Sequence, residues 1–294
     1  MNNPRLSAAV VVALAIAVLS VRQPATEPAI RADAPVLTVP ESSADAAPQP
    51  LAAHLRTTGQ VTGEARQIRD LRLADGFPAA LQALAARSLD SDPLRVTAHE
   101  DVRSVCALVH QPDTVSGRVD LDPNRRPWLD QLQRRCAGLG PNQLLPLEPT
   151  RSAVLVWRAQ VPETVAAREG EQAALRQSMA LLGSSVDTRL LYAALRYALV
   201  EQQLPLATIF AGRQIPVQAD IELTLVNAAD WIACARSDSC GSDGLWTHYQ
   251  CAQFGCPPGI DFPVALQRNS PQWQFEIAQA LTRWALSLER DSGG

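Results

Sequence analysis

Four of the six cysteines lie in one stretch, WIACARSDSCGSDGLWTHYQCAQFGC, which covers residues 231–256. Cysteines so close together could form disulfides, bind a metal ion or supply a reactive thiol. Five, ten and four residues separate Cys234, Cys240, Cys251 and Cys256, whereas structural zinc sites typically place about two to four residues between paired ligands. His248 completes no zinc spacing, and the C-x-x-C motif of redox enzymes is absent. We therefore predict disulfides, with no metal site and no cofactor.

The pairing of these cysteines is only partly constrained by the sequence. Cys106 and Cys136 lie on the apolar faces of neighbouring predicted helices, and a bridge between them would close a loop of about 31 residues, a contribution of roughly 3–4 kcal/mol. Three pairings are open to the other four cysteines. The antiparallel geometry of their two predicted helices favours Cys234 with Cys251 and Cys240 with Cys256.

Other chemistry finds little support in the sequence. All 26 basic residues are arginine, which excludes Schiff-base lysines, pyridoxal phosphate attachment, the P-loop and the kinase lysine. The segment HEDVR at 99–103 has Arg103 where the zinc-protease motif needs histidine. His99 lies about 10 Å along the helix axis from Cys106, so we interpret His99 and His110 as flanks of a core stripe. A pair of acids drawn from distant positions, as in glycosidases, stays open.

The tryptophans are the remaining signal. Trp231, Trp246, Trp273 and Trp284 fall in the last 64 residues, beside the cysteine block. They could pack against the disulfides, or they could form an aromatic surface for a glycan or for the side chains of a partner.

The N-terminal part predicts export. Residues 1–22 hold sixteen uncharged residues between Arg5 and Arg22, the pattern of a signal peptide or an uncleaved signal-anchor helix. Residues 23–60 are rich in proline and alanine and predict a disordered, extended linker. We expect the chain in the inner membrane facing the periplasm, or periplasmic or secreted if the signal is cleaved. The membrane is thus a partner if the segment stays, and the net charge of −4 argues against nucleic acid.

From 61 to 290 the sequence predicts helices. Asp92–Pro93, Asp122–Pro123, Asp187 and Ser270–Pro271 are helix starts, and a short helix is expected over 245–254. The segment SAVLVWRAQV at 152–161 is β-branched enough to be a strand but has no apparent partner. The predicted fold class is mainly α, an irregular bundle of antiparallel helix pairs braced by disulfides in its Cys-rich part, 231–256.

Residues 216–260, with WIACAR, SDSCGSDG and CAQFGC in this order, resemble the C-terminal cysteine block of uncharacterised exported helical proteins of bacteria. The resemblance implies export, helices and disulfides, and it implies no activity. Sel1-type helical repeats are a more distant analogy, which the missing period opposes. The order of anchor, linker and helices is similar to that of the lipase-specific foldases, but their R-x-x-F-D-Y signature is absent.

We expect an exported protein without enzymatic activity that presents a disulfide-braced helical surface to a protein partner of the bacterial envelope. The alternative is a cell-wall hydrolase, or a small-ligand binder, with an aromatic subsite near Trp273 and Trp284. A deep cleft that holds an acid near those two residues would favour the hydrolase.

Overall fold

The computed structural model describes residues 63–110, 123–140, 148–201 and 218–291. Every regular element in these ranges is a helix, so the prediction of a mainly α fold is confirmed. The predicted signal segment 1–22 and linker 23–60 lie outside the described residues. The elements, in chain order, are α1 (Gly63–Arg72), α2 (Phe77–Arg87), α3 (Leu94–His110), α5 (Arg126–Arg135), α6 (Arg151–Arg158), α7 (Pro162–Glu169), α8 (Glu171–Ser184), α9 (Thr188–Arg196), the π-helical turn η4 (Tyr197–Glu201), α11 (Gln218–Arg236), α12 (Leu245–Phe254), α13 (Phe262–Asn269) and α14 (Gln272–Asp291).

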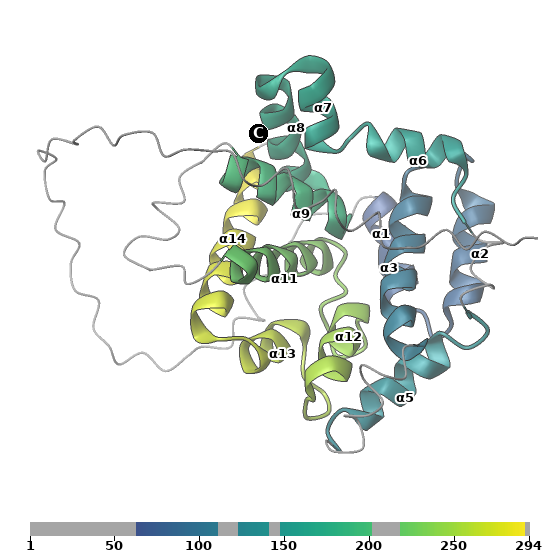
Figure 1. Cartoon of the computed structure of the whole chain (residues 1–294). Helices are drawn as coiled ribbons and strands as arrows, with labels where there is room; N and C mark the ends of the chain where they lie inside the picture. Colours follow the sequence, from purple (N-terminus) through teal and green to yellow (C-terminus); the bar gives the residue numbers. More distant parts are fainter. Residues whose placement is uncertain (1–62, 111–122, 141–147, 202–217, 292–294) are drawn as a thin grey trace, which may run out of the picture. The chain divides into compact units, whose positions relative to one another are not determined.

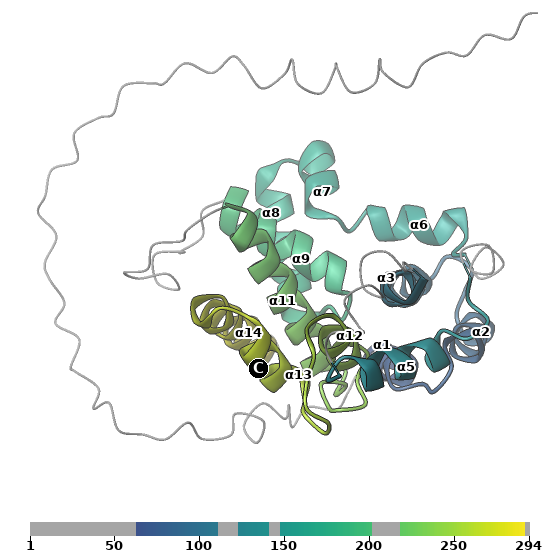
Figure 2. The same ribbon diagram turned by 60° about the horizontal axis from the view of Figure 1, so that its bottom comes forward.

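The helices pack in two groups that α12 and α13 connect (Figures 1 and 2). In one group α3 contacts α1, α2, α5 and α6, and in the other α11 lies between α9 and α14, with α8 against both of those. Helix α12 packs on α5 of the first group, and α13 contacts α11 and α14 of the second. The N-terminal and C-terminal parts of the described chain therefore meet at α12.

Several helix starts follow the sequence signals. Asp92 accepts a hydrogen bond from the backbone N–H of Leu94 at 2.9 Å, and Asp187 caps α9 through the N–H groups of Arg189 and Leu190. Helix α12 has the predicted bounds of 245–254. Helix α5 begins at Arg126, later than Asp122–Pro123 predicts, and has Pro127 in its first turn.

The β-branched segment 152–161 is helical as far as Arg158 and continues as a turn, so the strand alternative is wrong. Thr150 caps α6 by accepting a hydrogen bond from the N–H of Ala153 at 3.2 Å. No described element is a strand that could pair with this segment, and an unpaired strand would leave its backbone groups unsatisfied. The helix buries only Ala153 and leaves Leu155 and Val156 exposed.

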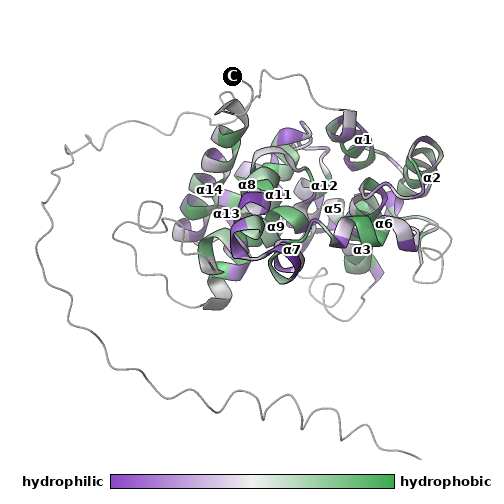
Figure 3. Cartoon of the chain, turned by 90° about the horizontal axis from the view of Figure 1, so that it is seen from above, coloured by the Kyte–Doolittle hydropathy of each residue, from purple (hydrophilic) through white to green (hydrophobic). Residues whose placement is uncertain are grey.

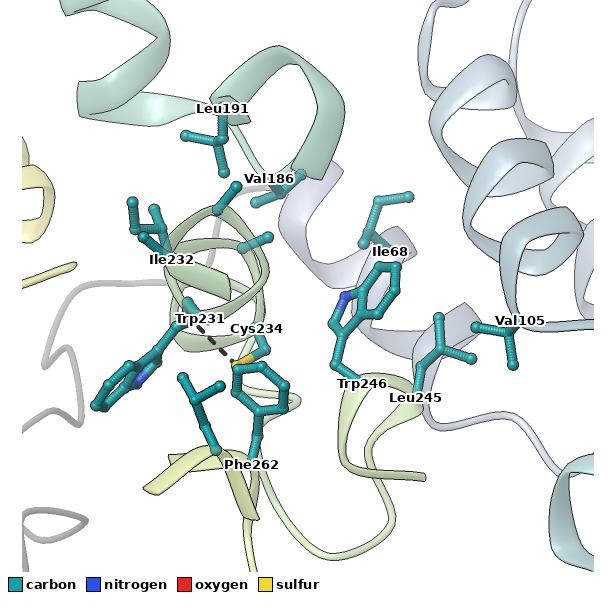
Figure 4. Close-up of a cluster of buried hydrophobic side chains, with 14 of the residues drawn as sticks. Ile68, Val105, Val186, Leu191, Trp231, Ile232, Cys234, Leu245, Trp246 and Phe262 are labelled. Atoms are coloured by element: carbon teal, nitrogen blue, oxygen red, sulfur yellow. Dashed lines mark hydrogen bonds between the residues drawn. The ribbon is translucent and has the colours of Figure 1, made fainter. Parts of the chain in front are cut away.

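The core is built from the apolar faces of these helices. Figure 3 shows polar and apolar residues on the same helices, as expected for amphipathic elements that bury one face. Figure 4 shows Trp231 and Ile232 of α11 in the core, and Trp246 at the start of α12 beside Ile68 of α1. All four of these side chains are buried.

The six cysteines form three disulfide pairs. Cys106 of α3 bonds to Cys136 at the end of α5, with 5.6 Å between their Cα atoms, which is the predicted clasp. The other pairs are Cys234–Cys240 and Cys251–Cys256, so the pairing favoured by antiparallel geometry is wrong.

Local turns at the helix ends explain the correct pairing. After α11 the chain reverses at Asp238, whose φ is positive, and the N–H of Ser239 bonds back to the carbonyl of Cys234. After α12 it reverses at Gly255, with φ of +82°. Such turns bring residues five or six apart close together, so each helix closes its own disulfide.

Arginines bond to carbonyls at the C-terminal ends of five helices, and all of these arginines except the half-buried Arg95 are buried. The last four carbonyls of a helix have no partner within it, and an arginine from another segment reaches them at α1, α2, α8, α11 and α12. Arg135 donates to the carbonyl of Arg72 in α1, and Arg95 donates to that of Ala85 in α2. Arg236 donates to the carbonyl of Leu182 in α8. Arg72 donates to that of Ala233 in α11, and Arg125 to that of Ala252 in α12. A guanidinium with five donors can bridge several carbonyls, which an ammonium does less well. The all-arginine composition therefore has a structural use.

Candidate functional site: a hollow beside Trp128

A cavity of about 360 Å³ lies between the start of α5 and the loops on either side of α12. Trp128 and Gln131 line it from α5, Asp243 from the loop before α12, and Cys256 from the loop after it. The other lining residues are Pro123, Asn124, Pro127, Ser242, Pro258 and Gly259. Segments more than 100 residues apart in the sequence therefore share one solvent-open hollow.

Hydrogen bonds hold the two sides of the hollow together. The indole N–H of Trp128 donates to the carbonyl of Cys256 at 2.9 Å. Nε of Arg125 donates to the carbonyl of Ala252 at 3.0 Å, and the N–H of Cys256 donates to the carbonyl of Asn124 at 3.4 Å. Trp128 is 5% exposed. Only a small part of its ring therefore faces the hollow, and most of the side chain packs beneath the wall.

The disulfide Cys251–Cys256 shapes the wall that follows α12. It closes the turn at Gly255, and the amide of Asn269 donates to Sγ of Cys256 at 3.5 Å. Gly259, also in the wall, has φ of +78°, a conformation that L side chains rarely adopt. The disulfide and this glycine therefore restrain the loop beside the hollow.

A close approach fixes the wall that precedes α12. Gly244 is the N-cap of α12, and a Cβ atom on it would lie only 2.0 Å from the carbonyl oxygen of Ser239. Only glycine fits at this position, although its φ of −70° is open to any residue. Ser242 and Asp243 are thereby held beside the hollow.

His248 lies behind Trp128, with 5.4 Å between their ring centroids. Burial and the neighbouring Arg135 guanidinium lower the pKa of His248 to about 4. Nη1 of Arg135 donates to Nδ1 of His248 at 2.9 Å, so the ring is neutral near pH 7 and carries its proton on Nε2. Arg135 also donates to the backbone carbonyl of Asp243 at 3.2 Å. Arg135 therefore connects His248 to the wall of the hollow that precedes α12.

A second polar cluster lies around Arg72, which is fully buried. Arg72 pairs with Asp101 at 2.8 Å and donates to the carbonyl of Val186 and to Ser237. Burial raises the pKa of Asp101 and raises that of Asp230 well above its usual range, the latter with help from Asp101. These groups join α1, α3 and α11.

The carboxylate of Asp187 lies close to this cluster and is fully bonded. It accepts hydrogen bonds from Thr97, from the indole N–H of Trp157 at 2.7 Å, and from the first N–H groups of α9. The crevice at this point is too narrow to admit a water molecule. Asp187 and Asp101 therefore act as structural groups.

The predicted aromatic surface is not formed. Trp231 and Trp246 are buried (Figure 4), and Trp231 stacks on Phe275 with 5.7 Å between the ring centroids. Trp273 and Trp284 are half-buried and pack against the core. Neither Trp273 nor Trp284 lines the hollow beside Trp128. This hollow is therefore not the cleft that the hydrolase alternative predicts.

The possible metal ligands His99, Cys106 and His110 do not come together in the structure. His99 is buried beside Glu100, whereas Nε2 of His110 lies 2.6 Å from the carbonyl of Leu139. Cys106 is bonded to Cys136. Within the described ranges, no three His, Cys, Asp or Glu side chains are grouped as metal ligands.

Sequence reasoning missed the residues of the hollow. Trp128 falls at core spacing with Leu132 and Cys136, and the sequence gives no sign that its other edge faces a cavity. The available signals were Pro257–Pro258–Gly259 directly after Cys256, and Pro123 and Pro127 around the start of α5, since proline-rich turns at a disulfide predict rigid loops.

In the described part of the chain, no helix combines the length and apolar character needed to cross a bilayer. Comparison of the chain with protein-family models, with curated proteins and with solved structures found no match.

Proposed function

We propose that this chain is an exported, non-catalytic binding module of the bacterial envelope, and that it recognises its ligand in the hollow beside Trp128. The observation that carries the proposal is a preformed, solvent-open cavity whose walls are fixed by a disulfide and by hydrogen bonds between distant segments. Rigid concave sites of this kind lose little conformational entropy when they bind. The disulfides are compatible with an oxidising compartment.

Binding suits the lining of the hollow better than hydrolysis does. Asp243 is the one carboxylic acid among the described lining residues, whereas glycoside hydrolysis uses two carboxyl groups. His248 lies behind Trp128 and is not among the lining residues. The predicted signal or anchor at 1–22 and linker at 23–60 would present the module outside the cytoplasm.

Site-specific photo-crosslinking in cells tests the proposal. A small aliphatic diazirine amino acid, close to glutamine in size so that it leaves the hollow open, replaces Gln131, which lines the hollow, or Gln133, which is exposed two residues further along α5. Because successive helix positions point in different directions, the two probes sample different surfaces of one helix. We expect a discrete adduct from position 131 and none of the same mass from 133. Equal adducts from both, or none from 131, would refute binding at the hollow.

A further inference from the structure

We infer that the hollow beside Trp128 binds an uncharged polyhydroxylated ligand, namely one or two sugar residues; this inference rests on the binding function proposed above. The charge of the site, its polar groups and its apolar surfaces support the inference independently.

The described lining of the hollow carries little charge, and the guanidinium groups of Arg125 and Arg135 behind it bond to backbone carbonyls. Among the described residues that line the hollow, Asp243 has the one ionisable side chain, since Cys256 is held in a disulfide. The guanidinium of Arg135 bonds to the carbonyl of Asp243 and is attracted to its carboxylate. No cation is among the described lining residues, so a phosphate or a carboxylate would lose its hydration without an ion pair. A strongly cationic ligand would have to compete with Arg135.

The polar lining groups match hydroxyl groups. Gln131 carries an amide that both donates and accepts, Ser242 carries a hydroxyl that does the same, and Asp243 accepts. A hydroxyl group of a ligand is likewise both donor and acceptor. A ring with several hydroxyl groups can therefore satisfy these side chains at the same time, which an apolar ligand cannot do.

The apolar lining groups match the faces of sugar rings. Pro123, Pro127 and Pro258 are exposed and contribute flat, rigid rings, and Trp128 contributes an edge. C–H groups on one face of a sugar ring can pack on such surfaces while its hydroxyl groups reach the polar lining. The volume of about 360 Å³ is near the lower end of the range for ligand pockets, about 300–1,000 Å³, which limits the bound part to one or two rings.

Saturation-transfer NMR with the full-length, oxidised protein in detergent tests the inference. The probes are glucose, N-acetylglucosamine and maltose, together with glucosamine and glucose 6-phosphate as matched cationic and anionic sugars. We expect at least one neutral sugar to bind with a Kd of the order of 1 mM, and glucose 6-phosphate to bind at least about tenfold more weakly.

Two matched variants locate the binding. Gln131→Arg should fill the hollow and abolish the sugar signals, whereas Gln133→Arg on the same helix should retain them, with equal thermal midpoints as evidence of folding. If no sugar binds up to about 50 mM, or if Gln131→Arg binds as well as the parent, the ligand class is wrong. A specific crosslink from position 131 would then still support the proposed function, whereas the loss of both signals would refute both.

Discussion

At the scale of single residues, Arg135 shows why this chain uses arginine. Its guanidinium makes hydrogen bonds to the carbonyls of Arg72, Ala74 and Asp243 and to His248. It also lies over the ring of Phe77, 4.9 Å from the centroid. Burial lowers the pKa of Arg135 to about 10, so the side chain stays charged at neutral pH and needs these acceptors.

We predict that Arg135→Lys lowers the free energy of unfolding by about 3 kcal/mol, because one ammonium cannot reach acceptors on three segments and buried carbonyls lose their donors. Arg134→Lys is the matched control, since Arg134 is the exposed neighbour in the same helix. Urea denaturation of both variants measures the difference. Equal midpoints for the two variants would show that the bonds of Arg135 carry no net stability.

His248 predicts an acid-sensitive fold. Its pKa is about 4 when folded and 6.5 in its ordinary state, so the unfolded chain takes up a proton first as the pH falls. The contribution of His248 is complete above pH 6.5 and is lost by about pH 4, a loss of about 3 kcal/mol. His248→Gln should flatten the stability curve across this window in urea titrations at several pH values.

Other titrating groups do not imitate this effect. Although burial raises the pKa of Glu100, the neighbouring His99, hydrogen bonds from Arg103 and the charge of Arg189 lower it to about 2, so its contribution is lost between about pH 4.5 and 2. Asp101 and Asp230 have raised pKa values, so they add stability as the pH falls. If the free energy of unfolding changes with pH in the His248→Gln variant as steeply as in the parent protein, the histidine titrates normally in the folded protein.

At the scale of elements, the turns at the ends of α11 and α12 determine how the cysteines pair. Peptide mapping under non-reducing conditions checks this directly, because chymotrypsin can cut after Trp246 and Tyr249, between Cys240 and Cys251. With the pairs Cys234–Cys240 and Cys251–Cys256, we expect two separate bridged fragments. One fragment that falls apart only on reduction would show that both bridges run between the two halves, as in either of the other two pairings, and would contradict the observed one.

The turn before α12 gives a second prediction. Gly244→Ala should lower the free energy of unfolding by about 2 kcal/mol or more, because its Cβ would overlap the carbonyl of Ser239. Gly241→Ala is the control, since a Cβ on Gly241 meets nothing within 4 Å, and it should change stability by less than about 0.5 kcal/mol. Thermal or urea unfolding of both variants separates the two positions; a similar small change in each would mean that the loop can shift.

The sequence predicts the elements better than it predicts their contacts. Capping residues such as Asp92 and Asp187 act within a few residues, so their helix starts are readable from local sequence. The pairing of Cys234 depends on a turn at Asp238 with positive φ, a conformation that few non-glycine residues adopt although aspartate adopts it more often than most, and the pairing could not be chosen from spacing. The hollow requires Trp128 and Cys256, 128 positions apart, to meet, and no local signal encodes that contact.

At the scale of the whole molecule, several long-range links have a covalent or ionic component. Cys106–Cys136 joins α3 to α5, Arg72 joins α1 to α3 and α11, and Arg135 joins α1 to α5 and to the loop before α12. Such links suit a protein exposed outside the cytoplasm, where reducing agents and chaperones that act on thiols are scarce. They also suit a site whose walls must not move on binding.

The thiol state of the protein in its native cells tests the central claim, that this is a disulfide-braced module of an oxidising compartment, most directly. Cells are quenched in acid, free thiols are alkylated before reduction, and the intact chain is weighed by mass spectrometry. We predict that none of the six cysteines is alkylated, because all are paired in the described structure. Alkylation of all six in the native protein would contradict both the bracing and the compartment.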